Sequence, residues 1–317
     1  MIEPSGLAEL FDLPGPITCR LLRSYTNDVY EVTSAEGHFV LKMYRDGWRT
    51  EGEIRYELDL LRHLAAKGLA VAGPVRRPGH DDLKRIDAAD GPRWAALFSF
   101  APGEKPRPPF MPALYRAFGR AIGRMHALSD DFVSPHPRRP LDLSLLIDAP
   151  LALAAPLVAD ADDRRFLTDL AARVRKAILE LDAEGLDRGP IHGDATLDNL
   201  HMTAAGEIVL YDFDSGGPGW RAADLQGWAA AGGAEYTEKW DAFRGGYQEI
   251  RPLAPADLRA APYLTIFWDF WGMKIDLDHR ILRAGPERTD AYLREQIGLL
   301  RERERTLLRG HQGNGGA

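Results

Sequence analysis

The stretch that decides the fold is Ile191-His192-Gly193-Asp194-Ala195-Thr196-Leu197-Asp198-Asn199-Leu200, which fits the pattern H-x-D-x-x-x-x-N. Strand character is predicted at Leu200–Met202 and at Ile208–Phe213, and the second of these segments contains Tyr211-Asp212-Phe213, which Asp214 follows. The first pattern arises by chance often enough to be weak on its own. The second acidic group comes thirteen residues after Asn199, at the end of a predicted strand, and together the two groups favour a catalytic site.

Two further candidates lie near the start of the chain. Val40-Leu41-Lys42 ends a β-rich segment, and Glu57 follows Lys42 by fifteen residues, within a segment from Glu51 to Lys67 that has the apolar spacing of a helix. Taken alone, Lys42 would be interpreted as a surface lysine with a buried stem. Glu57 alone would be interpreted as part of a solvated helix face. Both fit one reaction when they are combined with the downstream acids.

Phosphoryl transfer explains this combination, because such a protein must position ATP, neutralise its phosphates and accept one proton from the nucleophile. Lys42 on a strand can hold the phosphates, and Glu57 on a helix can hold the lysine. Asn199 and Asp212 offer the hard oxygen ligands that Mg²⁺ prefers. Asp194 can orient an acceptor hydroxyl and take its proton. The sequence therefore predicts ATP and Mg²⁺ as cofactors and Asp194 as the catalytic base.

The chain resembles the aminoglycoside phosphotransferase and choline kinase superfamily, distant relatives of protein kinases. The resemblance rests on the H-G-D form, with Gly193 where protein kinases carry arginine, and on the stretch Gly219-Trp220-Arg221-Ala222-Ala223-Asp224-Leu225. It covers roughly Leu21 to Leu225. It implies an α+β, two-lobed, protein-kinase-like fold with an N-terminal antiparallel sheet plus one helix and a mainly helical C-terminal lobe.

Other roles follow from this resemblance. Adenine would pair with backbone groups of Ser99 and Ala101 in a hinge between the lobes. The loop over the phosphates would contain Asn27, although this loop lacks the glycines of protein kinases. His192 is expected to brace the catalytic loop, and Asp224 to anchor it from below.

Proline and glycine suggest the lobe boundary. Regular structure should end in the proline-rich stretch that starts at Ala101-Pro102-Gly103 and runs to Pro112. We expect a nucleotide-binding lobe over residues 1–101, a catalytic and acceptor-binding lobe over 102–309 and a flexible tail over 310–317. In the first lobe, β-formers predict strands at Leu21–Arg23, Val29–Val32, Phe39–Met43 and Trp94–Phe100.

The sequence defines the acceptor site less clearly than the site for the phosphates. Trp268, Asp269 and Trp271 lie in one late segment, and aromatic faces beside acids suit a cationic or ring-bearing acceptor. The alternative is a core helix with a polar face. Asp198 could face the acceptor or solvent. Asp214 could assist the metal or cap its own loop.

Three functions remain open at this stage. The first is a kinase of a small-molecule hydroxyl, carried by an amino sugar, an amino alcohol, a hydroxy amino acid, or an antibiotic or other specialised metabolite. The second is a protein serine/threonine kinase of the bacterial stress-response type, although Gly216-Gly217-Pro218-Gly219 leaves little room for an activation loop. The third is a non-catalytic pseudokinase, which the complete set of expected catalytic residues opposes.

Bulk properties exclude several other classes. The 317-residue chain has a net charge of −7 and no basic run, which argues against a nucleic-acid partner. Its apolar stretches fall short of the ~18 residues that span a bilayer, so no membrane association is expected. Cys19 is the single cysteine, so the chain cannot form an intrachain disulfide. These features favour the cytoplasm, with a small hydroxylated acceptor as the partner and the oligomeric state left open.

Overall fold

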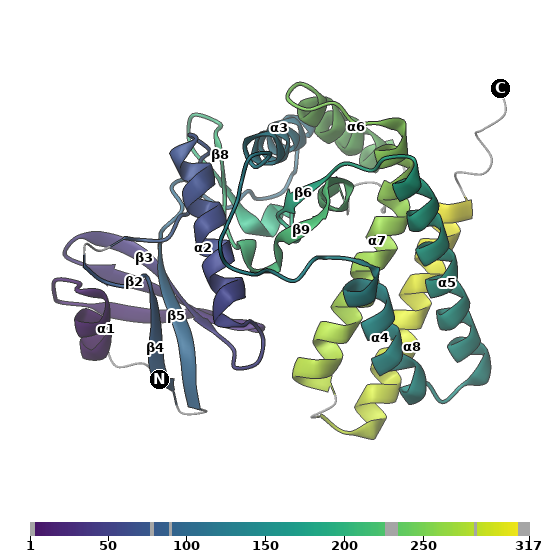
Figure 1. Cartoon of the computed structure of the whole chain (residues 1–317), viewed down its shortest axis with the longest axis horizontal. Helices are drawn as coiled ribbons and strands as arrows, with labels where there is room; N and C mark the ends of the chain where they lie inside the picture. Colours follow the sequence, from purple (N-terminus) through teal and green to yellow (C-terminus); the bar gives the residue numbers. More distant parts are fainter. Residues whose placement is uncertain (1–3, 77–78, 89–90, 226–233, 282–283, 310–317) are drawn as a thin grey trace. The chain divides into compact units, whose positions relative to one another are not determined.

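The computed structural model describes residues 4–76, 79–88, 91–225, 234–281 and 284–309 (Figure 1). The tail 310–317, expected to be flexible, lies outside these residues. The chain forms two compact units. The first unit comprises residues 1–107, 131–138 and 197–214, and the second comprises 108–130, 139–196 and 215–317. The lobe boundary expected at Ala101 stays a prediction.

The first unit is built on a five-stranded antiparallel sheet of order β1-β2-β3-β5-β4. The expected strands form, each somewhat longer than its β-rich core, and β4 was not foreseen. One short helix precedes the sheet and a longer helix follows β3. The bounds are α1 Pro4–Phe11, β1 Thr18–Ser24, β2 Asn27–Ser34, β3 Gly37–Tyr44, α2 Glu51–Ala66, β4 Leu83–Ala88 and β5 Gly91–Ser99.

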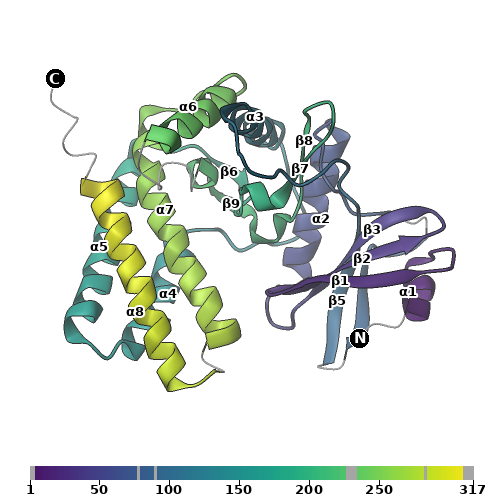
Figure 2. The same cartoon turned by 180° about the vertical axis from the view of Figure 1, so that it is seen from behind.

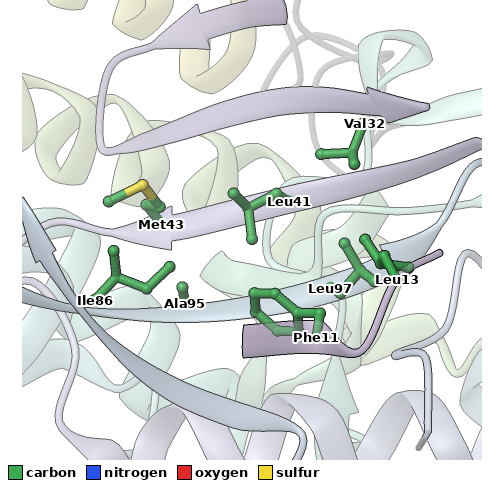
Figure 3. Close-up of a cluster of buried hydrophobic side chains, with 8 residues drawn as sticks. All are labelled: Phe11, Leu13, Val32, Leu41, Met43, Ile86, Ala95 and Leu97. Carbon is green, nitrogen blue, oxygen red and sulfur yellow. The ribbon is translucent and has the colours of Figure 1, made fainter. Parts of the chain in front are cut away.

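Alternation along β3 separates a core face from a site face. Leu41 and Met43 belong to a buried apolar cluster that also contains Phe11 (Figure 3). Val40 and Lys42 therefore face the other way, toward α2. The cluster comprises Phe11, Leu13, Val32, Leu41, Met43, Ile86, Ala95 and Leu97.

Helix α2 is fixed at its start and along its length. Thr50 and Glu53 form a capping box, which satisfies backbone N–H groups that the first turn leaves unpaired. Side chains of the segment 131–138 form hydrogen bonds with α2. In this segment Ser134 Oγ and His136 Nδ1 contact the Asp59 carboxylate at 2.7 and 2.9 Å. These contacts hold the helix that presents Glu57.

A hairpin of β7 (Leu200–Met202) and β8 (Ile208–Leu210) completes the first unit. Backbone bonds join Leu210 to Ala70 and Ala72, and the segment beyond Ala101 pairs with Met202 through Glu104 at 2.9 and 3.1 Å. The strand expected from Ile208 to Phe213 ends early, at Leu210. One reason is that Asp212 adopts the left-handed backbone conformation, with φ 62°, which no strand accommodates.

The second unit is mainly helical. Helices α4, α5, α7 and α8 lie side by side (Figure 2), and α3 packs closely on α6. A two-stranded sheet pairs β6 with β9. The α+β class predicted from the sequence is thus confirmed. The bounds are α3 Pro112–Leu128, α4 Ala149–Ala154, α5 Ala161–Ala183, β6 Arg188–Ile191, β9 Gly217–Trp220, α6 Ala234–Gln248, α7 Pro255–Asp276 and α8 Pro286–Arg303.

Across the described part of the chain, no helix combines the length and apolar character needed to cross a membrane.

Candidate active site

Lys42 and Glu57 meet as the sequence predicts. Lys42 Nζ lies 3.0 Å from Glu57 Oε1, and both side chains are buried. Tyr44, on the same face of β3, donates its hydroxyl to Glu57 Oε2 at 2.9 Å. Burial alone would lower the pKa of Lys42, but the carboxylates of Asp212 and Glu57 outweigh burial and raise it above its usual value. The ammonium therefore stays charged.

Asp212 joins this pair from the end of the hairpin. Its Oδ1 lies 2.9 Å from Lys42 Nζ, and its Oδ2 accepts a bond of 2.6 Å from Arg23. Burial would raise the pKa of Asp212, but Lys42 and Arg23 hold it below its usual range, so the carboxylate is ionised. Arg23 was not predicted, because its only signal in the sequence is a charge just before the expected phosphate loop.

Asp214 has a different task. Its carboxylate accepts bonds from Asn27 Nδ2 at 2.9 Å and from Trp48 Nε1 at 2.8 Å. Arg49 and Arg138 donate to its backbone carbonyl. Burial opposes ionisation, but the neighbouring cations keep the pKa of Asp214 far below its usual range. These contacts support the loop-capping interpretation rather than assistance to a metal.

A cavity of about 320 Å³ lies within the first unit. Its apolar end is made by side chains of β2, β3 and β5, and its charged end by Lys42, Glu57, Arg23 and Asp212. A nucleotide needs this division, because the base is apolar on its faces while the phosphates are anionic. The lining comprises Leu22, Arg23, Val29, Val40, Lys42, Glu57, Ala72, Phe98, Ser99, Phe100, Ala101, Lys105, Asp198, Asn199, His201, Tyr211 and Asp212.

Most of the predicted nucleotide and metal residues are thus brought to one cavity. Asn199 is buried at the hairpin's start, and its carbonyl accepts a bond of 3.1 Å from the Tyr211 backbone, which keeps it near Asp212. Asn27 is an exception, because the lining found among the described residues does not include it. Its side chain binds Asp214 and accepts from the Arg45 backbone N–H. A nucleotide contact by Asn27 stays a prediction.

Asp194 belongs to the second unit, on a loop after β6. The backbone N–H groups of His192 and Gly193 donate to the Asp224 carboxylate at 2.6 and 2.8 Å. His126 Nε2 lies 2.9 Å from the same carboxylate. Asp194 N–H in turn donates to His192 Nδ1 at 3.3 Å. The loop is therefore fastened at the two residues that precede Asp194, as expected if Asp224 anchors it and His192 braces it.

Gly193 explains the H-G-D form of the motif. It has φ 76°, and a Cβ at this position would overlap the carbonyl oxygen of Ser215. Gly193→Ala should lower the free energy of unfolding by several kcal/mol, since the clash adds to about 1–2 kcal/mol for the left-handed backbone. Urea denaturation checks this against Gly206→Ala, which has φ 79° but open space around its Cβ. Equal losses in the two variants would show that the Ser215 contact is unimportant.

Three of the expected acceptor residues lie on α7 of the second unit, and the fourth, Asp198, lies in the first unit. Trp268 donates its indole N–H to the Ala223 carbonyl at 3.0 Å, which fits the core alternative. Trp271 is also largely buried. Asp269 pairs with Arg303 at 3.3 Å, and burial raises the pKa of Asp269 to about 6. Asp198 is exposed and pairs with Lys105 at the rim of the cavity. Acceptor contacts by these four residues stay predictions.

A charged lysine buried between two carboxylates beside a nucleotide-sized cavity places the protein among kinase-like enzymes. Residues 18–261 match the family model described as phosphotransferase enzyme family. A protein of Deinococcus radiodurans, described as uncharacterized, is 37% identical over 86% of this chain and 82% of its own length. A homoserine kinase of Methylobacterium sp. (strain 4-46) is 30% identical over 80% of this chain and 78% of its own length.

A solved structure confirms the kinase-like fold predicted from the sequence. A microcompartment-associated aminopropanol kinase superposes with a TM-score of 0.74 and 22% identity, covering 93% of this chain and 95% of its own. The chain belongs to the phosphotransferase enzyme family. It is accordingly an enzyme that transfers phosphate to a hydroxyl acceptor, and the resemblance inferred from the H-G-D motif is confirmed.

Proposed function

We propose that the protein is an ATP- and Mg²⁺-dependent kinase of a small amine-bearing alcohol, such as a hydroxy amino acid or an amino alcohol. The observation that carries the proposal is Lys42, buried and held at 3.0 and 2.9 Å from Glu57 and Asp212 in the 320 Å³ cavity. Its fixed charge offsets that of the nucleotide phosphates, and burial makes this interaction stronger than it would be in water.

The residues present suit a magnesium ion. Asp212 and Asn199 both line the cavity and offer a carboxylate and an amide oxygen. In the described part of the chain, no three His, Cys, Asp or Glu side chains cluster as a metal-binding group. This suits Mg²⁺, which usually takes one or two protein ligands and completes its shell with waters and phosphate oxygens. When bound, the ion would neutralise phosphate charge.

Asp194 is assigned the proton transfer. Its carboxylate would accept the hydrogen bond of the acceptor hydroxyl, orient that oxygen and receive its proton as the bond to phosphorus forms. The Asp224 anchor fixes the loop backbone, so Asp194 loses little conformational freedom when the acceptor binds.

The class of acceptor is supported by the relatives. Several curated relatives at about 30% identity are homoserine kinases, and homoserine carries one primary hydroxyl and one amine. The protein-kinase alternative has less support, because short elements, β9 among them, occupy the stretch between Asp212 and Asp224 and leave no room for a long activation loop. Amino sugars and antibiotics remain further acceptors to test.

A coupled ADP-release assay tests the acceptor class with matched pairs that differ only in the hydroxyl. Homoserine is compared with 2-aminobutyrate, and 1-amino-2-propanol with propylamine. We expect acceptor-dependent ADP release only from a hydroxylated member, because a compound without that oxygen cannot take the phosphoryl group. Equal ADP release with both members of every pair would contradict the proposal, as would labelling of proteins but of no small molecule.

A further inference from the structure

His201 lies in the nucleotide cavity but has no part in the chemistry proposed above. It is the middle residue of β7, and its neighbour Leu200 is fully buried on the other face of the strand. His201 therefore faces the cavity, which it lines together with Ala101 and Ser99. Its Nδ1 lies 2.9 Å from the Ala101 carbonyl oxygen. Because a carbonyl can only accept, Nδ1 carries the hydrogen in this contact.

The ring is held in this orientation from two sides. Tyr211 packs edge-on against it at 5.1 Å between ring centroids, and Phe100 lies at 6.0 Å. The Tyr211 hydroxyl donates to the Asp198 carbonyl at 3.0 Å, which fixes the tyrosine in turn. The paired backbone bonds between Met202 and Glu104 hold β7 against the segment that carries Ala101. Neighbouring rings and backbone hydrogen bonds thus fix both His201 and Ala101 in the positions that allow their contact.

Backbone pairing decides which hinge groups remain for a base. Ser99 lies opposite Phe39, and the bond from Phe100 N–H to the His38 carbonyl spans this pair. Both backbone groups of Ser99 therefore point away from β3. The Ser99 N–H donates to the Gly73 carbonyl at 2.9 Å. A base is then offered an acceptor, the Ser99 carbonyl, followed by a donor, the Ala101 N–H.

This order of acceptor and donor matches adenine, whose 6-amino group donates and whose N1 accepts. Guanine in the same position would place O6 against the Ser99 carbonyl and its N1–H against the Ala101 N–H, so like groups would meet. Guanine could avoid this by shifting along the hinge, with O6 on the Ala101 N–H and its own N–H donors on the Ala101 carbonyl. His201 already donates to that carbonyl oxygen and so takes one of its two lone pairs, which leaves too few acceptor sites for both the N1–H and the 2-amino group of guanine.

We propose that His201 sets the preference for adenine over guanine nucleotides by occupying the Ala101 carbonyl. This inference rests on the proposed ATP-dependent function and adds a specificity-determining residue to it. His201 acts as a positioning residue, through Ala101, and takes no part in phosphoryl transfer. Loss of its N–H should therefore alter the ratio of nucleotide affinities rather than nucleotide binding as a whole.

Calorimetric titration with AMP-PNP and GMP-PNP tests the proposal on the full chain. Wild type should prefer the adenine nucleotide. In His201→Leu, the Kd of GMP-PNP divided by the Kd of AMP-PNP should fall by about tenfold, which is roughly the effect of one hydrogen bond. His201→Asn, whose amide N–H can reach the same carbonyl, should keep the ratio. Met202→Leu, on the same strand but outside the cavity lining, serves as the control.

Equal changes in both Kd values for His201→Leu, or an unchanged ratio, would overturn the proposal. A measurement on wild type needs no variant. ITP lacks the 2-amino group of GTP, so the two should bind alike while His201 holds the carbonyl. Much tighter binding of GTP than of ITP would also overturn it. If wild type bound no nucleotide, the proposed function itself would fail, and this result is distinct from the others.

Discussion

Asp194→Asn should lower kcat by about 10²–10⁴-fold, the usual contribution of a general base. The amide keeps the size of the carboxylate and can still contact the acceptor hydroxyl, but it cannot take the proton. The Kd of ATP should stay within about threefold of the wild-type value, because every described residue that lines the cavity belongs to the first unit and Asp194 does not. Steady-state kinetics with the best acceptor and nucleotide titration separate the two effects.

The control for this experiment is Asp241→Asn. Asp241 is an exposed residue of α6, in the second unit like Asp194, and pairs with Arg244 within the same helix. It should retain wild-type kcat and nucleotide affinity. Full turnover by Asp194→Asn would rule out the assigned base. A parallel loss of kcat and ATP affinity would instead indicate that the side chain supports the nucleotide site.

The fold and the charged end of the site were predictable because phosphate chemistry restricts the residues that can do it. Lys42 and Glu57 were expected to pair, and they do so in the cavity on the site face of β3. The family resemblance also implied an anchoring role for Asp224, whose carboxylate accepts bonds from the N–H groups of His192 and Gly193.

Other features could not be predicted because they depend on tertiary contacts. The contact of Arg23 with Asp212 spans 189 positions in the chain, and that of His201 with Ala101 spans 100. No local pattern encodes such distant pairs. The early end of β8 depends on the left-handed backbone of Asp212, which the β-forming residues on either side of it do not reveal. The residues that bind the acceptor are the most difficult to predict from the sequence, because many combinations of residue types can form a pocket of a given shape.

The largest effect on stability is expected from Lys42→Met, because it leaves the Glu57 and Asp212 carboxylates without their shared cation. Removing one partner of a buried pair typically costs about 3–5 kcal/mol. Arg23 still neutralises Asp212 in this variant, whereas Glu57 keeps, among the described residues, only the Tyr44 hydroxyl as a side-chain partner. Burial already raises the pKa of Glu57, and Lys42 is the leading influence that opposes this rise. The variant should therefore raise that pKa further.

The sign of the pH dependence follows from this change. A carboxyl group whose folded pKa lies above its unfolded value binds more protons in the folded state, so folding is favoured at low pH and weakened as pH rises through the interval between the two values. Denaturation of Lys42→Met at pH 5 and pH 8 should therefore give a lower free energy of unfolding at pH 8. The double variant Lys42→Met with Glu57→Gln also removes the unpaired carboxylate of Glu57. Its free energy of unfolding at pH 8 should be higher than that of Lys42→Met and should depend much less on pH. If the variant Lys42→Met showed the pH dependence of wild type, the charge of Glu57 would not depend on Lys42, and the prediction would be wrong.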